Sequence, residues 1–361
     1  MLTQFTQVCV SEATAQRLTE VVGRAYEAIQ LAEVERIERD WPEVEPGSDK
    51  LVLSVDGAFV PLVGGEWAEV KTLVVGEVGE PTQRDDKTVV PTHSHSYFSR
   101  VAEAELFQRL TLGELYRRGV ETAERVAVVS DGAEWIQGFI AFHAPDAVRI
   151  LDFPHAAQRI CQIGEAVLGA EHASLHAWQT RQLHQLKHHG PQKVFESLRI
   201  FAAAHLRVPL IAENLAYLEK REAQMQYPSF LSQEWPIGSG MVESANKLVV
   251  EARLKGAGMH WARANVNPML SLRNAVCNDR WAEAWAVSSA QIERFGRQQA
   301  VQSKESASCN SATAASPRRS ARKKADTEVT SQRKPTAEHP WRRKNYATKA
   351  AIAQTGSQAK L

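Results

Sequence analysis

Short apolar segments between residues 51 and 155 predict a β-sheet. Residues 51–55 (LVLSV) form a continuous apolar run with β-branched residues, which is typical of a buried strand. The dipeptide Gly64-Gly65 predicts a hairpin turn after this strand. The same pattern predicts four further strands, at residues 68–75, 88–92, 125–130 and 147–151.

Helical periodicity predicts helices at residues 99–119 and 133–143, a helical lead-in over residues 1–45, and an all-helical block from Ala156 to about Tyr227. Three strands therefore come first, and strands then alternate with helices. This order predicts an α/β fold with a mixed sheet flanked by helices.

One more helix is expected from Met241 to Lys255. At 100° per residue, four apolar residues fall on one side of it and Glu243 points away from them. The four residues are Met241, Ala245, Leu248 and Ala252.

These elements divide the chain into four predicted parts. After Trp285 the apolar periodicity fades, and Ser, Ala, Lys and Arg become frequent, as in disordered segments. The predicted parts are the lead-in at 1–45, an α/β domain at 50–155 and 236–285, a helical insertion subdomain at 156–235, and a basic, largely disordered tail at 286–361.

Charge is distributed unevenly along the chain. The 361 residues are 43% hydrophobic and 24% charged, which excludes a wholly disordered chain, a collagen-like repeat and a disulfide scaffold. The formal net charge is +1, yet residues 286–361 hold 15 Lys and Arg against 5 Asp and Glu, leaving 28 against 37 for the rest. An acidic body with a basic tail indicates a polyanionic partner such as nucleic acid.

Cysteine spacing and hydropathy point to a reducing, cytoplasmic setting. No two of the four cysteines have metal-ligand spacing, so no zinc ribbon or redox pair is predicted. No apolar run approaches the roughly 18 residues that a membrane span needs, and no secretory signal is evident. The cysteines are Cys9, Cys161, Cys277 and Cys309.

Three aspartates follow predicted strands. Asp56 ends the run LVLSVD, Asp131 follows VVS, and Asp152 follows residues 147–151. Taken singly, Asp56 and Asp131 are typical of Asp-Gly turns, and Asp152 of a helix N-cap. Together they suggest a site, because ligands gather outside the carboxyl ends of parallel strands.

Glu243 is the fourth candidate carboxylate. Taken alone, a Glu in a first helical turn is favoured by the helix dipole and can pair with Lys247 four residues on. If Glu243 converged with the aspartates, these carboxylates would suit two Mg²⁺ ions. Such ions bind oxygen ligands and can stabilise the attacking and the leaving oxygen of a phosphodiester displacement.

The motifs around these carboxylates resemble the DDE transposases of bacterial insertion sequences, in particular the Kra-type group related to the Mutator-like branch. The resemblance spans residues 50–285 and a tail motif, HPWRR. It rests on VDGAFVPL with Asp56, VVSDGAEWIQG with Asp131, LDFPHAAQR with Asp152 and His155, and GSGMVESANKL with Glu243.

This resemblance implies a ribonuclease-H-like domain with a helical insertion before the catalytic Glu. Asp56, Asp131 and Glu243 would bind two Mg²⁺ or Mn²⁺ ions, and His155 would be a catalytic neighbour that contacts DNA or a phosphate. Alternatively, His155 bonds locally at a helix start. The implied activity is hydrolysis at element ends followed by 3′-hydroxyl strand transfer into target DNA.

The resemblance further implies DNA partners, namely the terminal inverted repeats and the target, a homo-oligomer in a synaptic complex, and a nucleoid-associated cytoplasmic location. Full-length relatives carry an N-terminal end-recognition region, whereas Asp56 comes after only 55 residues without Cys-x-x-Cys. A truncated, catalytically incompetent remnant that binds DNA or regulates its full-length relative is therefore the alternative. A structure-specific nuclease on the same fold is a third hypothesis.

Basic residues after Glu243 are candidate DNA contacts. Trp261 lies among basic and glycine residues and would stack on an unpaired base, or else pack in the core. Histidine pairs four apart, such as His184 and His188, are interpreted as helix-surface residues rather than metal ligands. The DNA-contact candidates are Lys247, Arg253, Lys255, His260, Trp261 and Arg263.

Clusters of basic residues in the tail predict salt-dependent DNA affinity; the alternative is a merely solubilising tail. The clusters are Arg318-Arg319, Arg322-Lys323-Lys324, Arg333-Lys334 and Arg342-Arg343-Lys344. Deleting the residues after Arg297 should make the plot of the logarithm of the DNA association constant against the logarithm of the salt concentration less steep. Its slope should fall in magnitude by about 0.9 for each phosphate that the tail neutralises. Fluorescence anisotropy with duplex DNA measures this slope, and a chain lacking the uncharged residues 351–359 is the control. An unchanged slope would refute the hypothesis.

Overall fold

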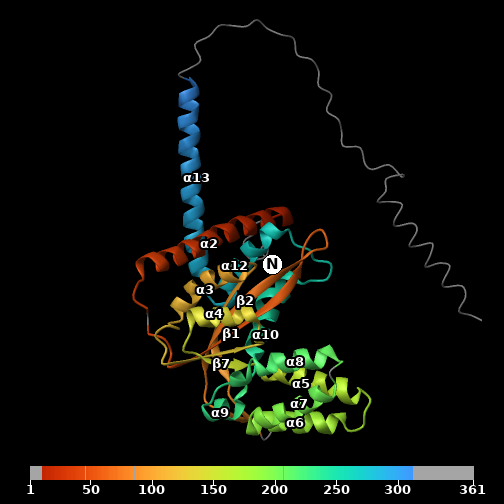
Figure 1. Cartoon of the computed structure of the whole chain (residues 1–361). Coiled ribbons are helices and arrows are strands. Elements are labelled where there is room, and N and C mark those ends of the chain that lie inside the picture. Colours follow the sequence, from red (N-terminus) through yellow and green to blue (C-terminus); the bar gives the residue numbers. More distant parts are fainter. Residues whose placement is uncertain (1–9, 45, 85–86, 206, 312–361) are drawn as a thin grey trace, which may run out of the picture. The chain divides into compact units, whose positions relative to one another are not determined.

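The computed structural model describes residues 10–44, 46–84, 87–205 and 207–311. These residues include a five-stranded mixed sheet, which can be followed in Figure 1. β2 pairs antiparallel with β1 and β5, whereas β6 pairs in parallel with β1 and β7. The strands in spatial order are β5 (Thr92–Arg100), β2 (Trp67–Val78), β1 (Lys50–Pro61), β6 (Arg125–Ser130) and β7 (Val148–Leu151). A separate hairpin pairs β3 (Thr82–Arg84) with β4 (Lys87–Val89).

The two faces of the sheet are covered by different helices. Alternate side chains of a strand point to opposite faces. Val52 and Val129 therefore face the core formed with α5 to α9, whereas Leu53 and Val128 face α3 and α4. The first set is α5 (Phe153–Leu168), α6 (Leu175–His189), α7 (Gln192–Ala204), α8 (Pro209–Glu219), the 3₁₀ turn η1 (Glu222–Met225) and α9 (Tyr227–Ser232). The second set is α3 (Ala104–Arg117) and α4 (Glu134–His143).

The mixed sheet with flanking helices confirms the predicted α/β class, and residues 153–232 are helical apart from short connections, as expected. These helices share a hydrophobic core with the sheet, since Ile150 and Leu151 of β7 pack with Ile160 and Leu198. Contacts group the described residues up to Gln302 as one compact unit. The division into an α/β domain and an insertion subdomain stays a prediction.

The predicted helix at 99–119 was wrong at its start, because β5 continues to Arg100. The expected strand at 88–92 is replaced by β4 and the first residue of β5. β5 is rich in Ser and His, so the apolar pattern that predicted the other strands is absent from it. The edge of β5 that no strand pairs with forms hydrogen bonds to side chains from α12 (Arg263–Cys277) and from Asn278, which follows it. Asn274 bonds the N–H and the C=O of Ser99, and Asn278 bonds those of Tyr97.

The helix expected at Met241–Lys255 has a different apolar face from the predicted one. It consists of α10 (Gly240–Ala245), the π-helical turn η2 (Asn246–Glu251) and α11 (Ala252–Leu254). A π turn holds an extra residue and so rotates the face that follows. Val249 and Val250 are consequently buried, and Leu248 is 45% exposed.

Long helices lie at both ends of the described chain. α2 (Glu12–Asp40) confirms the helical lead-in; it begins at Ser11, whose Oγ accepts from Thr14 N, and packs on α12 and α3. α13 (Trp281–Ser311) makes part of the predicted tail helical, because Ala, Gln, Glu and Arg favour helix there. Residues 312–361, with most of the basic clusters, lie outside the described residues. No helix in the described ranges is long and apolar enough to cross a membrane.

Ile150 tests the shared core. The Ile150→Ala variant should lose about 2–5 kcal/mol of unfolding free energy, because Ile150 is 1% exposed between the sheet and the helices. Ile200→Ala is the matched control: Ile200 is 68% exposed on α7, so the change should stay within about 0.5 kcal/mol. Urea unfolding measures both, and equal losses would contradict the shared core.

Candidate functional site

The parallel register brings the three predicted aspartates to one end of the sheet. Val55 in β1 lies opposite Ser130 in β6, and Ser130 lies opposite Leu151 in β7. Asp56, Asp131 and Asp152 each follow one of these aligned residues. The three aspartates are therefore aligned, with Asp131 and Asp152 directly after the carboxyl ends of β6 and β7. The strand end predicted at Asp56 was wrong, because β1 continues to Pro61 and Asp56 pairs with Thr72 of β2, so Asp56-Gly57 is not a turn.

Asp56 carries an electrostatic signature of crowded carboxylates. Partial burial raises the pKa of its carboxyl, and the negative charges of Asp131 and Glu243 raise it further. The backbone N–H of Gly57 and the imidazole of His155 act in the opposite direction. Four of the predicted site residues thus lie close enough to influence one another.

Asp131 lies in a turn that Tyr217 of α8 and Arg221, just after α8, stabilise. Its Oδ1 accepts a hydrogen bond from Ala133 N at 2.9 Å, and Gly132 adopts a φ of +79° that favours glycine. Tyr217 donates to the carbonyl of Asp131, and the buried Arg221 donates through Nε to the carbonyl of Gly132 at 2.8 Å. The Asp-Gly turn is therefore present, and it presents the Asp131 carboxylate beside Asp56.

Glu243 reaches the same site from a different direction. Val242 and Ala245 pack against Val74 of β2, which places α10 across the sheet. Glu243 is exposed, and with Asp56 it lines a cleft of about 350 Å³. The structure therefore brings together residues that lie far apart in the sequence.

Asp152 and His155 form an acid–base pair next to this group, in which Asp152 is buried and the His155 side chain is 44% exposed. Asp152 is fully buried; its Oδ2 accepts from His155 Nδ1 at 2.6 Å, and its Oδ1 accepts from Ser239 N at 2.5 Å. The hydrogen bond to Asp152 raises the pKa of His155, and the charges of Asp131 and Asp56 add to this. The N-cap expected for Asp152 is confirmed, since Oδ2 also accepts from His155 N.

The predicted DNA-contact residues fall into two groups. Lys247 and Lys255 line the carboxylate cleft, where Lys255 Nζ lies 2.8 Å from Glu251 Oε1. Arg253, His260 and Trp261 line a second cleft, of about 630 Å³, beside α2. Arg263 is exposed at the start of α12 and lines neither cleft.

Trp261 has the packing role that was its alternative interpretation. Its backbone bonds Pro61 and Val63 at the end of β1, and its indole N–H donates to Leu254 O at 3.1 Å. The ring is half-buried, and the Arg253 guanidinium lies 5.7 Å from its centroid. Stacking on a DNA base stays a prediction.

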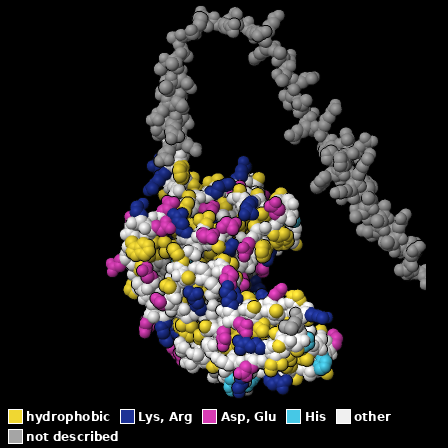
Figure 2. Space-filling view, viewed as in Figure 1, with side chains coloured by type: hydrophobic (Ala, Val, Ile, Leu, Met, Phe, Trp, Pro, Cys, Tyr) yellow, Lys and Arg dark blue, Asp and Glu magenta, His cyan; other side chains and the backbone are white. Residues whose placement is uncertain are grey.

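The viewed surface shows no broad basic face. In Figure 2, Lys and Arg side chains are interspersed with Asp and Glu over the described part of this side. Any attraction for a polyanion on this side would come from local groups of cations rather than from a uniform field.

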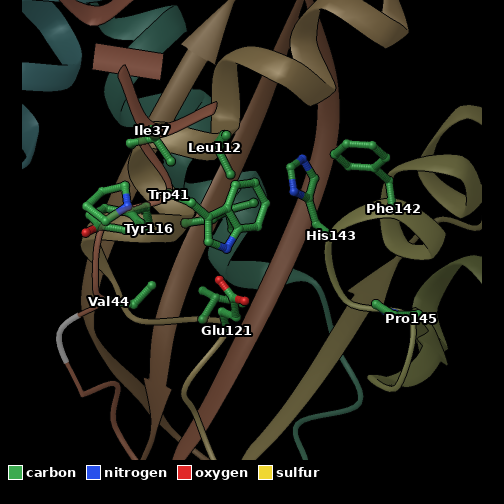
Figure 3. Close-up of a pocket in the computed structure, with 12 residues that line it drawn as sticks. Ile37, Trp41, Val44, Leu112, Tyr116, Glu121, Phe142, His143 and Pro145 are labelled. Atoms are coloured by element: carbon green, nitrogen blue, oxygen red, sulfur yellow. The ribbon is translucent and has the colours of Figure 1, made fainter. Parts of the chain in front are cut away.

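A third cleft, of about 320 Å³, has a different chemistry (Figure 3). Trp41, Leu112 and Phe142 give it a largely apolar lining. Burial lowers the pKa of His143 to about 4, so this imidazole is neutral near pH 7, and it donates from Nε2 to Gln108 O. The cleft lacks paired carboxylates and is not the predicted site.

The donor chemistry of the site suits a hard cation, although its side chains are not gathered around one. The described residues contain no group of three or more His, Cys, Asp or Glu side chains that could hold a metal ion as they stand. The carboxylates of Asp56, Asp131 and Glu243 would have to turn toward one another. Burial is the largest cause of the raised pKa of Asp56, and the charges of Asp131 and Glu243 add to it; a divalent cation would relieve this repulsion.

Sequence reasoning overlooked two residues of this region. Asn246 donates from Nδ2 to Asp56 Oδ2 at 2.9 Å, and Arg221 supports the turn after Asp131. Asn246 lies three residues after Glu243, a spacing that places both on one helix face and was available as a signal. Arg221 had no such signal, because only the fold brings it to Gly132.

Comparison with known proteins assigns the chain to no family, since no protein-family model and no curated protein matches it.

The Asp152–His155 pair gives a testable titration. Asp152→Asn should lower the pKa of His155, because it removes the charge that favours the imidazolium. In the native protein, the stabilisation from this imidazolium is present below the ordinary pKa of 6.5 and is lost as the pH rises through the raised pKa. NMR titration of the imidazole Cε1–H measures the shift.

Asp146→Asn is the control, since Asp146 is an exposed aspartate before β7 at the opposite end of that strand. An unchanged His155 titration in Asp152→Asn would show that the pair does not control the charge of the imidazole.

Proposed function

We propose that this chain is a DNA transposase of the DDE type that hydrolyses a phosphodiester at insertion-sequence ends and joins the freed 3′-hydroxyl to target DNA. The observation that carries the proposal is the register that aligns Asp56 with Asp131, together with the cleft that Asp56 and Glu243 line. This arrangement fits the motif resemblance, which relied on these three residues.

The sheet supports a ribonuclease-H-like assignment. An antiparallel half, formed by β1, β2 and β5, meets a parallel half, formed by β1, β6 and β7. The helices that precede Glu243 in the sequence pack on one face of this sheet. A mixed sheet followed by a helical block before the last carboxylate is what the resemblance implies.

The reaction class follows from the donor set. Two Mg²⁺ or Mn²⁺ ions bound by Asp56, Asp131 and Glu243 would supply Lewis-acid stabilisation of the attacking and leaving oxygens. In the first step water attacks phosphorus and loses a proton to solvent, and the P–O bond to the 3′-oxygen of the element end breaks, this oxygen taking up a proton from solvent. In the second step the resulting 3′-hydroxyl loses its proton and attacks a target phosphorus, and the P–O bond to a 3′-oxygen of the target strand breaks, that oxygen leaving as a protonated hydroxyl.

The surrounding residues have supporting roles in the proposal. His155 is oriented by Asp152, whose hydrogen bond raises the pKa of the imidazole, and His155 would contact a DNA phosphate. Lys247 and Lys255 carry ammonium groups along the cleft that Asp56 and Glu243 line, and these would neutralise phosphates. A synaptic homo-oligomer and a nucleoid-associated location belong to the same proposal.

Three conservative substitutions test the carboxylates. Asp56→Asn, Asp131→Asn and Glu243→Gln should each reduce Mg²⁺-dependent nicking and strand joining by at least about 100-fold, because loss of a cation ligand removes several kcal/mol of charge stabilisation. The substrate is a DNA fragment ending in the element's inverted repeat, and products are resolved on denaturing gels.

Glu251→Gln is the matched control, since Glu251 lines the same cleft and pairs with Lys255. Full activity in Asp56→Asn would refute the assignment of the carboxylates. DNA binding without nicking by the unsubstituted chain would favour the remnant hypothesis, and nicking independent of the terminal repeats would favour a structure-specific nuclease.

A further inference from the structure

Asn246 has a buried amide oxygen without a partner next to the carboxylates. The residue is 6% exposed, and its Nδ2 donates to Asp56 Oδ2 at 2.9 Å. Its Oδ1 is buried and accepts no hydrogen bond in the described structure. Asn246 also lines the cleft that contains Asp56 and Glu243. A buried polar atom of this kind is costly unless something satisfies it.

The orientation of this amide follows from its neighbour. Exchanging the two ends of the amide would place Oδ1 against the Asp56 carboxylate, where two acceptors repel each other. Nδ2 must therefore face Asp56, because it alone can donate there. This leaves Oδ1 as an acceptor or ligand without a protein donor.

Other buried asparagines in the described part of the chain behave differently. Asn214 accepts from Arg159 and donates to Gln162, and Asn274 bonds both backbone groups of Ser99. Both ends of these amides are used, as expected for structural residues. In Asn246 only the amide nitrogen forms a hydrogen bond, so its amide oxygen is available to a ligand.

The backbone at Asn246 is also unusual. It opens the π-helical turn Asn246–Glu251, directly after the α-helical turn that carries Glu243. Short π-helical turns occur frequently at functional sites. Because Glu243 and Asn246 are three residues apart, both side chains are directed to the same face.

We propose that Asn246 is a further residue of the divalent-cation site: its amide N–H orients Asp56, and its amide oxygen is an oxygen donor to the hydrated cation. This inference rests on the proposed function, because it assumes that Asp56 and Glu243 bind the cation. Amide oxygens are ordinary ligands for such hard cations, directly or through a bound water.

Direct Mn²⁺ binding to the full chain without DNA tests this role independently of activity. Isothermal titration calorimetry should show Asn246→Ala binding Mn²⁺ about 10–100-fold more weakly, the usual effect of removing an outer ligand or its support. Asn246→Asp keeps an oxygen ligand, although it loses the N–H that faces Asp56, and should therefore bind Mn²⁺ more tightly than Asn246→Ala. Asn214→Ala, which removes another buried amide, should leave affinity unchanged.

Circular dichroism melting with and without Mn²⁺ shows whether each variant is folded and reports binding a second time as a shift in Tm. For a folded Asn246→Ala variant, unchanged affinity would overturn the inference. Affinity in Asn246→Asp as weak as in Asn246→Ala would overturn the oxygen-donor role.

The two proposals fail in different ways. If the unsubstituted chain binds Mn²⁺ and Asp56→Asn abolishes binding while Asn246→Ala does not, the inference about Asn246 is wrong and the cation site stands. If the unsubstituted chain does not bind Mn²⁺, or Asp56→Asn binds it equally well, the proposed cation site itself is wrong.

Discussion

The parallel pairing of β6 with both β1 and β7 is the constraint on which the candidate site depends. It aligns Val55, Ser130 and Leu151, so the residue that follows each of them lies at the same end of the sheet. Burial is the main reason that the pKa of Asp56 is raised, and repulsion from Asp131 and Glu243 adds to it. Stability alone would not favour such an arrangement, which is why a positively charged partner is the natural interpretation.

The surrounding structure compensates the charges unequally. Asp152, the most buried of the three aspartates, accepts hydrogen bonds from His155 and Ser239 and thereby joins the start of α5 to the segment that enters α10. Asp131 has one oxygen bonded within its own turn. Asp56 receives an amide N–H from Asn246. Asp152 thus has a structural role, whereas Asp56 keeps bonding capacity toward the cleft that it lines with Glu243.

Much of the fold was predictable because it follows apolar patterns. The sequence predicted the apolar strands β1, β2, β6 and β7, the turn at Gly64-Gly65 and the helical block. Buried strands and helices show a recognisable pattern of apolar residues in the sequence. β5 was not predicted, because side chains of the helix α12 complete its hydrogen bonds, and polar residues can then occupy an edge strand. The apolar face after Glu243 was also missed, since a π turn changes the period on which such a prediction rests.

The sequence by itself determined the α/β class, the charge asymmetry, and the candidacy of Asp56, Asp131, Asp152, His155 and Glu243 from their motifs. The tertiary structure decided which of these groups lie near one another, because strand register and helix packing join residues far apart in the chain. It also separated Lys247 and Lys255, beside the carboxylates, from Arg253 and Trp261, and it added Asn246. Local patterns record propensity and burial, whereas convergence at a site depends on contacts that form only when the whole sheet and its helices pack.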